Sequence, residues 1–346
     1  MKVKWGVIGA GGIADRRTIP GMLQARNAEL SAVMEIDMDF AERLRQKYNA
    51  KTAYDDAEKL VWDSDVQAVY IASPVVFHKD QVLMAAQAKK HILVEKPVAL
   101  TSKDGEELIE VCRKNRVLIA AGLMMRFHSY NRKIRELLQD GVIGQLVSCN
   151  AQFTCWYPDI PSAWRQIKSQ GGGGALMDMG IHCLDLIQYM TGSRITRLAA
   201  FNGTKTFSYE VEDSSAVMFE LENGAYGHVD SHFNIPDEAA KWRMEFYGTK
   251  GRIIADETIG QVEGGTVQVL KVEKDKGYDA QQDRKEVSSE TVKVQLGNMY
   301  TKEIESFSDS ILYGKQVEVP AWQAVEVQRI VEAAYRSSES GVFMEL

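Results

Sequence analysis

The sequence predicts an α/β protein in which a doubly wound parallel sheet is followed by a mostly antiparallel sheet. Up to about Gly122, short apolar runs alternate with segments of helical spacing, which is the order of a parallel sheet with crossover helices. Beyond that point the runs become long and alternating, and Asn223-Gly224 within one of them is a hairpin turn signal. With 346 residues the chain is long enough for two domains, which we expect at residues 1–122 and 123–346.

Each expected element follows from its local pattern. The runs that predict parallel strands are VKWGVIG, LSAVME, AVYIAS, HILVEK and VLIAAG, beginning at residues 3, 30, 68, 91 and 117. Helical spacing predicts helices at residues 20–25, 40–48, 80–89, 103–115 and 131–140. In the second half we expect a hairpin at 215–233, a solvated hairpin or loop at 271–290, and a closing amphipathic helix from residue 321 that ends at Gly341.

Composition restricts the class of partner. The 48 acidic residues outnumber the 41 basic ones, so a surface for nucleic acid or for an anionic membrane is not expected. No apolar run approaches the roughly 20 residues that span a bilayer. The four cysteines show neither metal-site spacing nor disulfide density, and MKVKWGVIGAGG leads directly into a strand. We therefore expect a cytoplasmic protein that acts on small molecules.

The first motif with a chemical meaning is VIGAGGIADRR. Gly9, Gly11 and Ala14 form a GxGxxA pattern directly after an apolar strand and before a helical segment. In that position Gly9 allows a tight turn, Gly11 lets backbone approach a pyrophosphate, and Ala14 permits close helix packing. A tight turn without a ligand is the alternative. We expect a nicotinamide dinucleotide here, with Gly12 and Ile13 beside its phosphates at the helix N-terminus.

The end of the second strand predicts which dinucleotide is bound. Glu35 occupies the position from which such a domain hydrogen-bonds the adenosine ribose, and its charge would repel a 2′-phosphate. NAD is therefore expected, and NADP is less favoured. Arg16 and Arg17 are the counter-evidence, although their place at the start of the first helix favours the pyrophosphate or solvent.

Polar residues follow the later strands and are expected to face the same crevice, because ligands bind beyond the carboxyl ends of parallel strands. After AVYIA the chain reads SPVVFH, which supplies Ser73, Pro74 and His78. After HILV it reads Glu95-Lys96-Pro97. A lysine there could hydrogen-bond a substrate hydroxyl beside the nicotinamide, and Pro97 restricts its backbone. A solvated loop lysine paired with Glu95 is the alternative.

Another motif with a chemical meaning is GGGGALMDMGIHCLD, in which four glycines precede a helical segment that carries polar residues. Asp178, His182 and Asp185 stand at i, i+4 and i+7, which is one face of an α-helix. A histidine oriented by a carboxylate is a candidate general base. There are two alternatives. One is a core histidine whose hydrogen bonds are satisfied by a carboxylate, and the other is a pair of metal ligands, although no other histidine has the spacing of a ligand. The run from Gly171 lets backbone approach a ligand or another backbone closely.

Together these motifs resemble the glucose-fructose oxidoreductase / inositol dehydrogenase family, also called Gfo/Idh/MocA. The resemblance rests on GxGxxA, on EKP after the fifth strand, on Trp164-Arg165 and on GGGxxxDxGxHxxD, and it covers nearly the whole chain. It implies an N-terminal Rossmann domain for binding NAD(P). It also implies a C-terminal α/β domain for substrate, whose large open sheet often builds dimers or tetramers.

The same resemblance implies hydride transfer on sugars, inositols or related polyols. The family's catalytic Lys falls on Lys96, and its Asp and His fall on Asp178 and His182. It further implies that the Lys96-Pro97 bond is cis. Many relatives have Asn where this chain has Val75, so the contact that this Asn makes to the cofactor is in doubt here.

The expected mechanism is oxidation of a secondary alcohol. His182 takes the hydroxyl proton, Asp178 orients the imidazole, and Lys96 stabilises the developing alkoxide. Residues expected near the substrate are Arg126, Trp164 and Arg165, with weaker expectations for Trp156 and Tyr157. Two other classes stay open. One is an epimerase, lyase or hydrolase that recycles a bound cofactor, and the other is a non-catalytic regulator.

Overall fold

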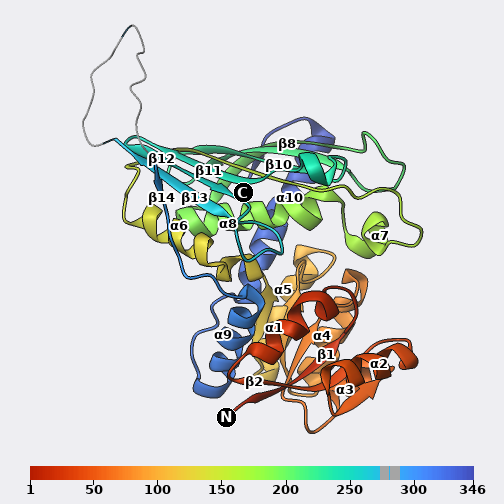
Figure 1. Cartoon of the computed structure of the whole chain (residues 1–346). Helices are drawn as coiled ribbons and strands as arrows, with labels where there is room; N and C mark the ends of the chain where they lie inside the picture. The colour runs from red at the N-terminus through yellow and green to blue at the C-terminus, as the bar shows by residue number, and fades with distance from the viewer. Residues whose placement is uncertain (273–279, 281–288) are drawn as a thin grey trace. The chain divides into compact units, whose positions relative to one another are not determined.

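The computed structural model describes residues 1–272, 280 and 289–346, which fall into two compact units (Figure 1). Unit 1 contains Met1–Phe127, Ile160–Met177 and Gly297–Arg329. Unit 2 contains His128–Asp159, the described part of Asp178–Leu296, and Ile330–Leu346. Each unit thus combines segments that lie far apart in the sequence. The domain limits 1–122 and 123–346 remain a prediction.

Unit 1 is built on the parallel sheet that the apolar runs predict. Its six strands have the order β3-β2-β1-β4-β5-β6, and every neighbouring pair is parallel. This is the doubly wound order, whose ligand crevice opens where the direction of winding changes, between β1 and β4. The strands are β1 Val3–Ile8, β2 Ala28–Met34, β3 Thr52–Tyr54, β4 Ala68–Ile71, β5 His91–Glu95 and β6 Ile119–Gly122.

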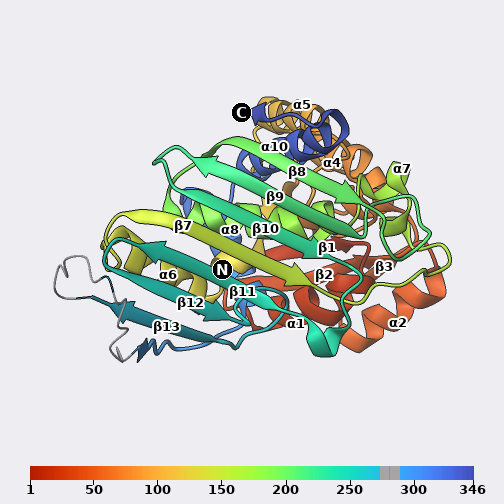
Figure 2. The ribbon, with the colours of Figure 1, turned by 90° about the horizontal axis from the view of Figure 1, so that it is seen from above.

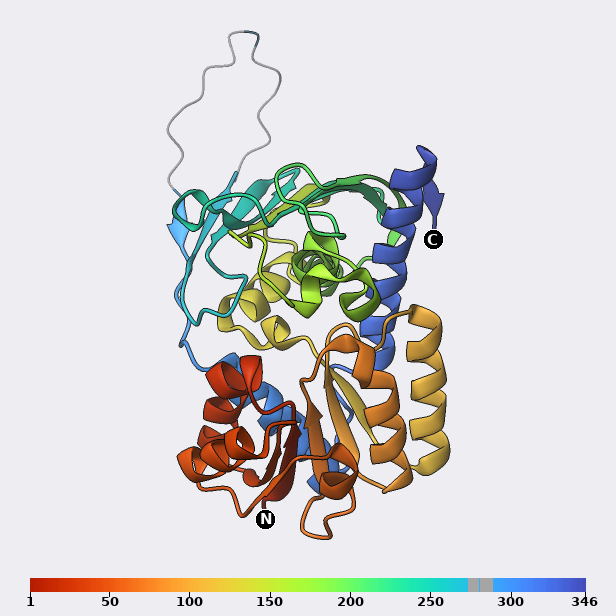
Figure 3. The same cartoon turned by 90° about the vertical axis from the view of Figure 1, so that its right-hand side faces the viewer.

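Helices cover both faces of this sheet (Figure 3). They are α1 Ile19–Gln24, α2 Met38–Tyr48, α3 Ala57–Val61, α4 His78–Gln87, α5 Ser102–Asn115 and α9 Met299–Tyr313. The four helices predicted for this region are confirmed, whereas β3, α3 and α9 were not predicted. Two of the confirmed helices begin with a side-chain cap: Asp37 accepts from the Asp39 amide at 2.9 Å, and Thr101 accepts from the Asp104 amide at 3.1 Å.

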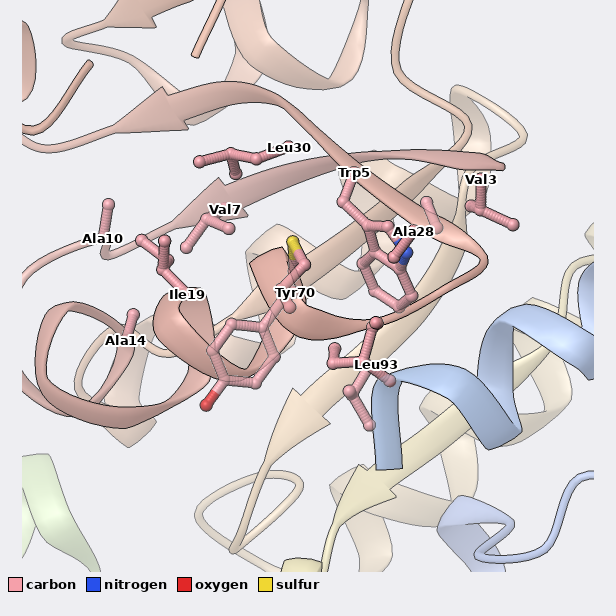
Figure 4. Close-up of a cluster of buried hydrophobic side chains, with 14 of the residues drawn as sticks. Val3, Trp5, Val7, Ala10, Ala14, Ile19, Ala28, Leu30, Tyr70 and Leu93 are labelled. Carbon is pink, nitrogen blue, oxygen red and sulfur yellow. The ribbon is translucent and has the colours of Figure 1, made fainter. Parts of the chain in front are cut away.

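The core of unit 1 joins β1 to its neighbours and to α9 (Figure 4). Trp5 is fully buried, its ring centroid lies 5.9 Å from that of Phe307, and its Nε1 donates to Ser308 Oγ at 3.2 Å. Each large apolar side chain buried in this way stabilises the fold by about 1.5–3 kcal/mol. The core around β1 is therefore completed by α9, which lies about 300 residues later in the chain.

Unit 2 is built on a nine-stranded sheet of order β14-β13-β12-β11-β7-β10-β9-β8-β15. Only β7 and β10 are parallel neighbours, so the predicted mostly antiparallel sheet is confirmed. Gly224, with φ +84°, makes the predicted hairpin turn between β9 and β10. The strands are β7 Leu146–Thr154, β8 Ile195–Gly203, β9 Ser214–Leu221, β10 Tyr226–His232, β11 Trp242–Gly248, β12 Gly251–Asp256, β13 Thr266–Lys271, β14 Glu290–Thr291 and β15 Met344–Glu345.

Two helices of unit 2, α6 Ser129–Gln139 and α8 Ile181–Thr191, pack on each other, and α8 packs on β7. Figure 2 shows the sheet face on, with both helices behind it and no described helix in front. The closing helix α10, Ala321–Ser340, ends at Gly341 (φ +73°) as predicted. The hairpin or loop expected at 271–290 lies mostly outside the described residues. None of the described helices has the length and apolarity needed to cross a membrane.

Candidate active site

Four strands of the parallel sheet end at one edge, and the predicted cofactor residues follow these ends. Ile8 pairs with Met34 on β2 and with Ile71 on β4, and Ile71 pairs with Val94 on β5. The turns after these strands are therefore neighbours. Gly9, with φ +72°, lies so close to the loop after β4 that a Cβ there would stand 2.6 Å from the Ser73 nitrogen. Only glycine fits this position.

Glu35 lies directly against the glycine turn. Its Oε1 accepts from the Gly11 amide at 2.6 Å, and a Cβ on Gly11 would stand only 2.9 Å from the same oxygen. Gly11 therefore makes room for a carboxylate, a use that the sequence pattern did not predict. Gly12 is left-handed at φ +53° and has open space where a side chain would stand. These features suit a dinucleotide, since a phosphate can approach bare backbone while its ribose meets a carboxylate.

The helix after the glycine turn begins in an unexpected form. Ile13 is followed by a π-helix, Ala14–Thr18, before α1 starts at Ile19. Ala14 is fully buried, as close packing of this helix requires. Arg16 and Arg17 are exposed on the π-helical turn. Single π-helical turns inside helices are frequent at functional sites.

His78 connects the loop after β4 to the turn after β5. It is 1% exposed, its Nε2 lies 2.9 Å from the Ser73 carbonyl oxygen, and its Nδ1 lies 2.9 Å from the Pro97 carbonyl oxygen. Burial lowers the pKa of His78, and a neutral ring can donate to only one of these two acceptors. Both ring nitrogens are thus engaged by backbone. Pro74 precedes the short 3-10 helix Val75–Phe77, which leads into α4, and Val75 is buried.

Glu95, Lys96 and Pro97 form the turn after β5, and the predicted cis bond between Lys96 and Pro97 is confirmed. The Glu95 carboxylate accepts from the Tyr70 hydroxyl and from the Lys96 amide. Burial raises the pKa of Glu95, outweighing these hydrogen bonds and the nearby charges of Lys96 and Arg165. Sequence analysis missed Tyr70, because a tyrosine inside the apolar run AVYIAS has the pattern of a core residue.

The glycine run of unit 1 packs against Trp164 and Arg165, which lie in a short 3-10 helix, Trp164–Gln166. A Cβ on Gly171 would stand 3.2 Å from both the Arg165 Cα and the Trp164 carbonyl oxygen. The glycines thus permit close approach to another backbone, one of the two uses expected. The Arg165 guanidinium lies 4.2 Å from the Trp164 ring centroid. Arg126, 7% exposed, donates to Gln323 at the start of α10.

Asp178 and His182 belong to unit 2, and the helix that carries them differs from the prediction. Leu176–Gly180 is π-helical, and α8 begins only at Ile181. His182 and Asp185 lie within α8 and are 4% and 1% exposed. Asp178 lies in the wider π-helical turn, so the α-helical rule that residues i and i+4 share one face does not apply to Asp178 and His182. The apolar residues between these polar ones face the core: Leu176, Ile181, Leu184, Leu186 and Ile187 are all fully buried.

The two weaker aromatic candidates lie at the end of β7 in unit 2. Trp156 is 42% exposed, and its ring centroid is 5.1 Å from that of Phe207. Tyr157 packs on Phe233 at 5.0 Å, and its amide donates to the Phe233 carbonyl. Within the described residues, no group of three or more His, Cys, Asp or Glu side chains could hold a metal ion.

Comparison with known proteins agrees with this architecture. Residues 3–123 match the oxidoreductase family with an NAD-binding Rossmann fold, and residues 131–254 match the GFO/IDH/MocA C-terminal domain. Myo-inositol 2-dehydrogenase of Thermotoga maritima is 30% identical over 72% of this chain and 74% of its own length. D-xylose 1-dehydrogenase (NADP(+)) 2 of Haloferax volcanii is 27% identical over 99% of both chains. The crystal structure of aldose-aldose oxidoreductase from Caulobacter crescentus, complexed with glycerol, has a TM-score of 0.90 at 24% identity and covers all of both chains. The chain therefore belongs to the Gfo/Idh/MocA family of oxidoreductases.

Proposed function

We propose that this oxidoreductase transfers a hydride between nicotinamide and a secondary alcohol of a sugar, an inositol or a related polyol. The observation that carries the proposal is the edge of the parallel sheet, where the glycine turn, Glu35 and Lys96 follow strands that end in register. A dinucleotide held on the turn would present its nicotinamide towards the later strands, among which β5 ends in a lysine. The named activities of relatives support the substrate class.

The proposed roles follow the chemistry of each side chain. When bound, nicotinamide supplies the hydride chemistry. His182 accepts the hydroxyl proton during oxidation and returns it during reduction, while Asp178 orients the imidazole and stabilises its charged form. Lys96 hydrogen-bonds the reacting oxygen and stabilises negative charge that develops on it. His78 acts indirectly in this scheme, since its ring lies between the Ser73 and Pro97 carbonyl oxygens and donates a hydrogen bond to one of them.

We assign the substrate surroundings to Trp164, Arg165 and Arg126, with Trp156 and Tyr157 as weaker candidates. A guanidinium stacked on an indole, as in Trp164 and Arg165, gives both an aromatic face and hydrogen-bond donors for a polyhydroxylated ring. Ser73, Pro74, Gly12 and Ile13 are assigned to the cofactor. The protein is proposed to act in the cytoplasm, with neither nucleic acid nor membrane as a partner.

NAD is the proposed cofactor, because Glu35 stands where a 2′-phosphate would meet a like charge. The named NADP specificity of the Haloferax volcanii relative makes this a point to test directly. Fluorescence titration with NADH and NADPH is expected to show tighter binding of NADH by at least about tenfold, equivalent to roughly 1.4 kcal/mol. Glu35→Gln should narrow that ratio. Tighter binding of NADPH by the wild type would contradict the role given to Glu35.

The reaction class can be tested with a panel of polyols, aldoses and sugar acids. A dehydrogenase reduces free NAD⁺ in proportion to product, which absorbance at the reduced-nicotinamide band detects. An epimerase, lyase or hydrolase with a recycled cofactor would convert substrate without net reduction, and chromatography would show it. Substrate turnover with no net NADH would therefore replace the proposed reaction by this second class.

The open face of the nine-stranded sheet supports a homodimer or homotetramer. Phe201, Met218 and Tyr226 lie on this face and are 82%, 66% and 62% exposed. Their strands pair so that Met218 stands opposite Ala199 on β8 and His228 on β10, all on one side of the sheet. Large apolar side chains gathered on one face favour an interface between copies of the chain.

A further inference from the structure

A chain of three side chains in unit 1 runs from the glycine turn to the turn that carries Lys96. Thr18, the last residue of the π-helix, donates from Oγ1 to the Tyr70 hydroxyl oxygen at 3.0 Å. The Tyr70 hydroxyl in turn donates to Glu95 Oε1, and the Lys96 amide donates to the same carboxylate. Thr18 and Tyr70 are both fully buried. Figure 4 shows the Tyr70 ring inside the core with its oxygen pointing away from the other labelled side chains.

Apolar packing alone does not account for this arrangement. A phenylalanine would fill the same space beside Leu93, whereas a buried tyrosine hydroxyl requires partners. The neighbouring strand also makes room for the carboxylate: Glu95 pairs with Gly122 on β6, and a Cβ on Gly122 would stand 3.1 Å from Glu95 Cδ. The Tyr70 hydroxyl donates to the carboxylate, the Thr18 hydroxyl donates to Tyr70, and the missing side chain of Gly122 leaves room for the carboxylate.

We propose that Tyr70 is a positioning residue for Lys96: it fixes the Glu95 carboxylate beside the lysine and, through Thr18, ties that carboxylate to the π-helix that follows the glycine turn. This inference rests on the proposed role of Lys96. Tyr70 touches neither substrate nor cofactor in this scheme. Its effect on the reaction passes through Glu95, because the position and charge of that carboxylate set the electrostatic surroundings of Lys96.

Other charged and titratable groups act on the same carboxylate. They are Lys96 itself, Arg165 from the Trp164–Gln166 turn, and Tyr300 and Glu303 from α9. Glu303 is 3% exposed, and its Oε1 has no hydrogen-bond partner among the described residues. Burial and the charge of Glu95 raise the pKa of Glu303 well above its ordinary value. The surroundings thus shift both carboxyl groups towards the neutral form, and the shift is larger for Glu303 than for Glu95.

The test is Tyr70→Phe, read through pH dependence. Loss of the hydrogen bond from Tyr70 should raise the pKa of Glu95 further, because that bond favours the ionised carboxylate. Because His182 as the general base also contributes to the acid limb of kcat/KM, the test compares that limb in Tyr70→Phe and in the wild type. It is expected to move to higher pH in the variant, with the rate approaching that of the wild type at alkaline pH. A purely structural defect would lower the rate at every pH and leave the limb in place.

A second measurement does not depend on activity. Reductive ¹³C-methylation of the full-length protein gives an NMR signal for Lys96, which is identified by its absence in Lys96→Met. That signal should show a step as Glu95 titrates, and the midpoint should rise in Tyr70→Phe. Glu303→Gln should keep the step, because its source is Glu95. An unchanged midpoint in folded Tyr70→Phe, or loss of the step in Glu303→Gln, would overturn the inference.

Gly122→Ala and Tyr247→Phe complete the experiment. Gly122→Ala places a Cβ 3.1 Å from Glu95 Cδ and should disturb the carboxylate and move the midpoint as well, so it decides the matter if Tyr70→Phe does not fold. Tyr247→Phe removes another hydroxyl that donates to a carboxylate, Glu245, at 3.1 Å in unit 2, and no shift is expected. Full activity of Lys96→Met would refute the proposed catalytic role of Lys96, whereas the NMR result would still test the link from Tyr70 to Glu95.

Discussion

Lys96 lies between two residues whose positions are fixed by buried partners. Glu95 on one side is bonded to Tyr70, and the carbonyl of Pro97 on the other side is bonded to His78. A surface lysine needs no such support on both sides. This arrangement favours the interpretation of Lys96 as a working group over that of a solvated loop lysine.

Lys96→Met should lower turnover strongly and change the pH profile, because it keeps the bulk of the side chain and removes its charge. We expect a loss of about 10²-fold or more in kcat, comparable to the loss of one electrostatic stabiliser. Steady-state kinetics across pH measure both effects. Lys59→Met is the matched control, since Lys59 is an exposed helix residue paired with Asp55 at 2.8 Å. Wild-type kinetics in Lys96→Met would exclude the catalytic role.

His182→Ala should remove most turnover and leave NAD affinity nearly intact. A general base typically contributes about 10²- to 10⁴-fold in rate. Because His182 is only 4% exposed, His182→Asn should be measured beside it to separate lost chemistry from a cavity. His228→Asn, at an exposed histidine of β10, is the control. If His182→Ala turns over at the normal rate, His182 is a core residue.

At the scale of elements, two π-helical segments follow the two glycine-rich turns. Ala14–Thr18 follows the turn at Gly9, and Leu176–Gly180 follows the run that begins at Gly171. Sequence analysis expected ordinary α-helix in both places. Over five residues the apolar spacing cannot distinguish the wider turn, because the choice depends on how the segment packs.

The attachment of α9 to unit 1 depends on a buried carboxylate. Asp309 is 5% exposed and accepts from Asn27 at 2.6 Å, from Lys315 at 2.8 Å and from Arg26 at 2.9 Å. The Lys315 ammonium, more than Arg26 and Asn27, lowers the pKa of Asp309 despite burial. Asp309→Asn should therefore reduce the free energy of unfolding by about 1.5–3 kcal/mol near neutral pH.

The pH dependence of that loss has a definite sign. Since the folded pKa lies below the unfolded value of about 3.9, the stabilisation is fully present above that value. It disappears as the pH falls through the folded pKa, so the difference between wild type and Asp309→Asn should shrink below about pH 4. Urea unfolding at several pH values measures it. Asp65→Asn, which removes an exposed partner of Lys4, should cost much less, because solvent screens an exposed ion pair. Equal losses for the two variants would contradict the role of burial.

At the scale of the whole molecule, the open face of the nine-stranded sheet predicts association. The double variant Phe201→Glu/Met218→Glu places charges on the most exposed apolar positions of that face and should shift an oligomer towards monomer. Light scattering after size exclusion gives the mass. Trp62→Glu, at a side chain of unit 1 that is 61% exposed, should leave the mass unchanged. A wild type that is monomeric at micromolar concentration would refute the proposed interface.

The sequence alone determined the features that depend on local pattern. The five predicted parallel strands, the hairpin at Gly224 and the end of α10 at Gly341 all follow from apolar period and turn chemistry within a few residues. The cofactor turn and the turn at Lys96 could be predicted as well, because ends of parallel strands share one edge. The roles of Asp178 and His182 stay predictions that kinetics must test.

Tertiary structure decided the features that depend on neighbours remote in the chain. Nothing near Tyr70 in the sequence predicts that its hydroxyl meets Thr18 and Glu95, since that contact requires three separate segments to be packed together. Likewise, α9 joins the core of unit 1 only because Phe307 meets Trp5 across some 300 residues. Local pattern specifies which face of an element is apolar, whereas close packing specifies which atoms meet there.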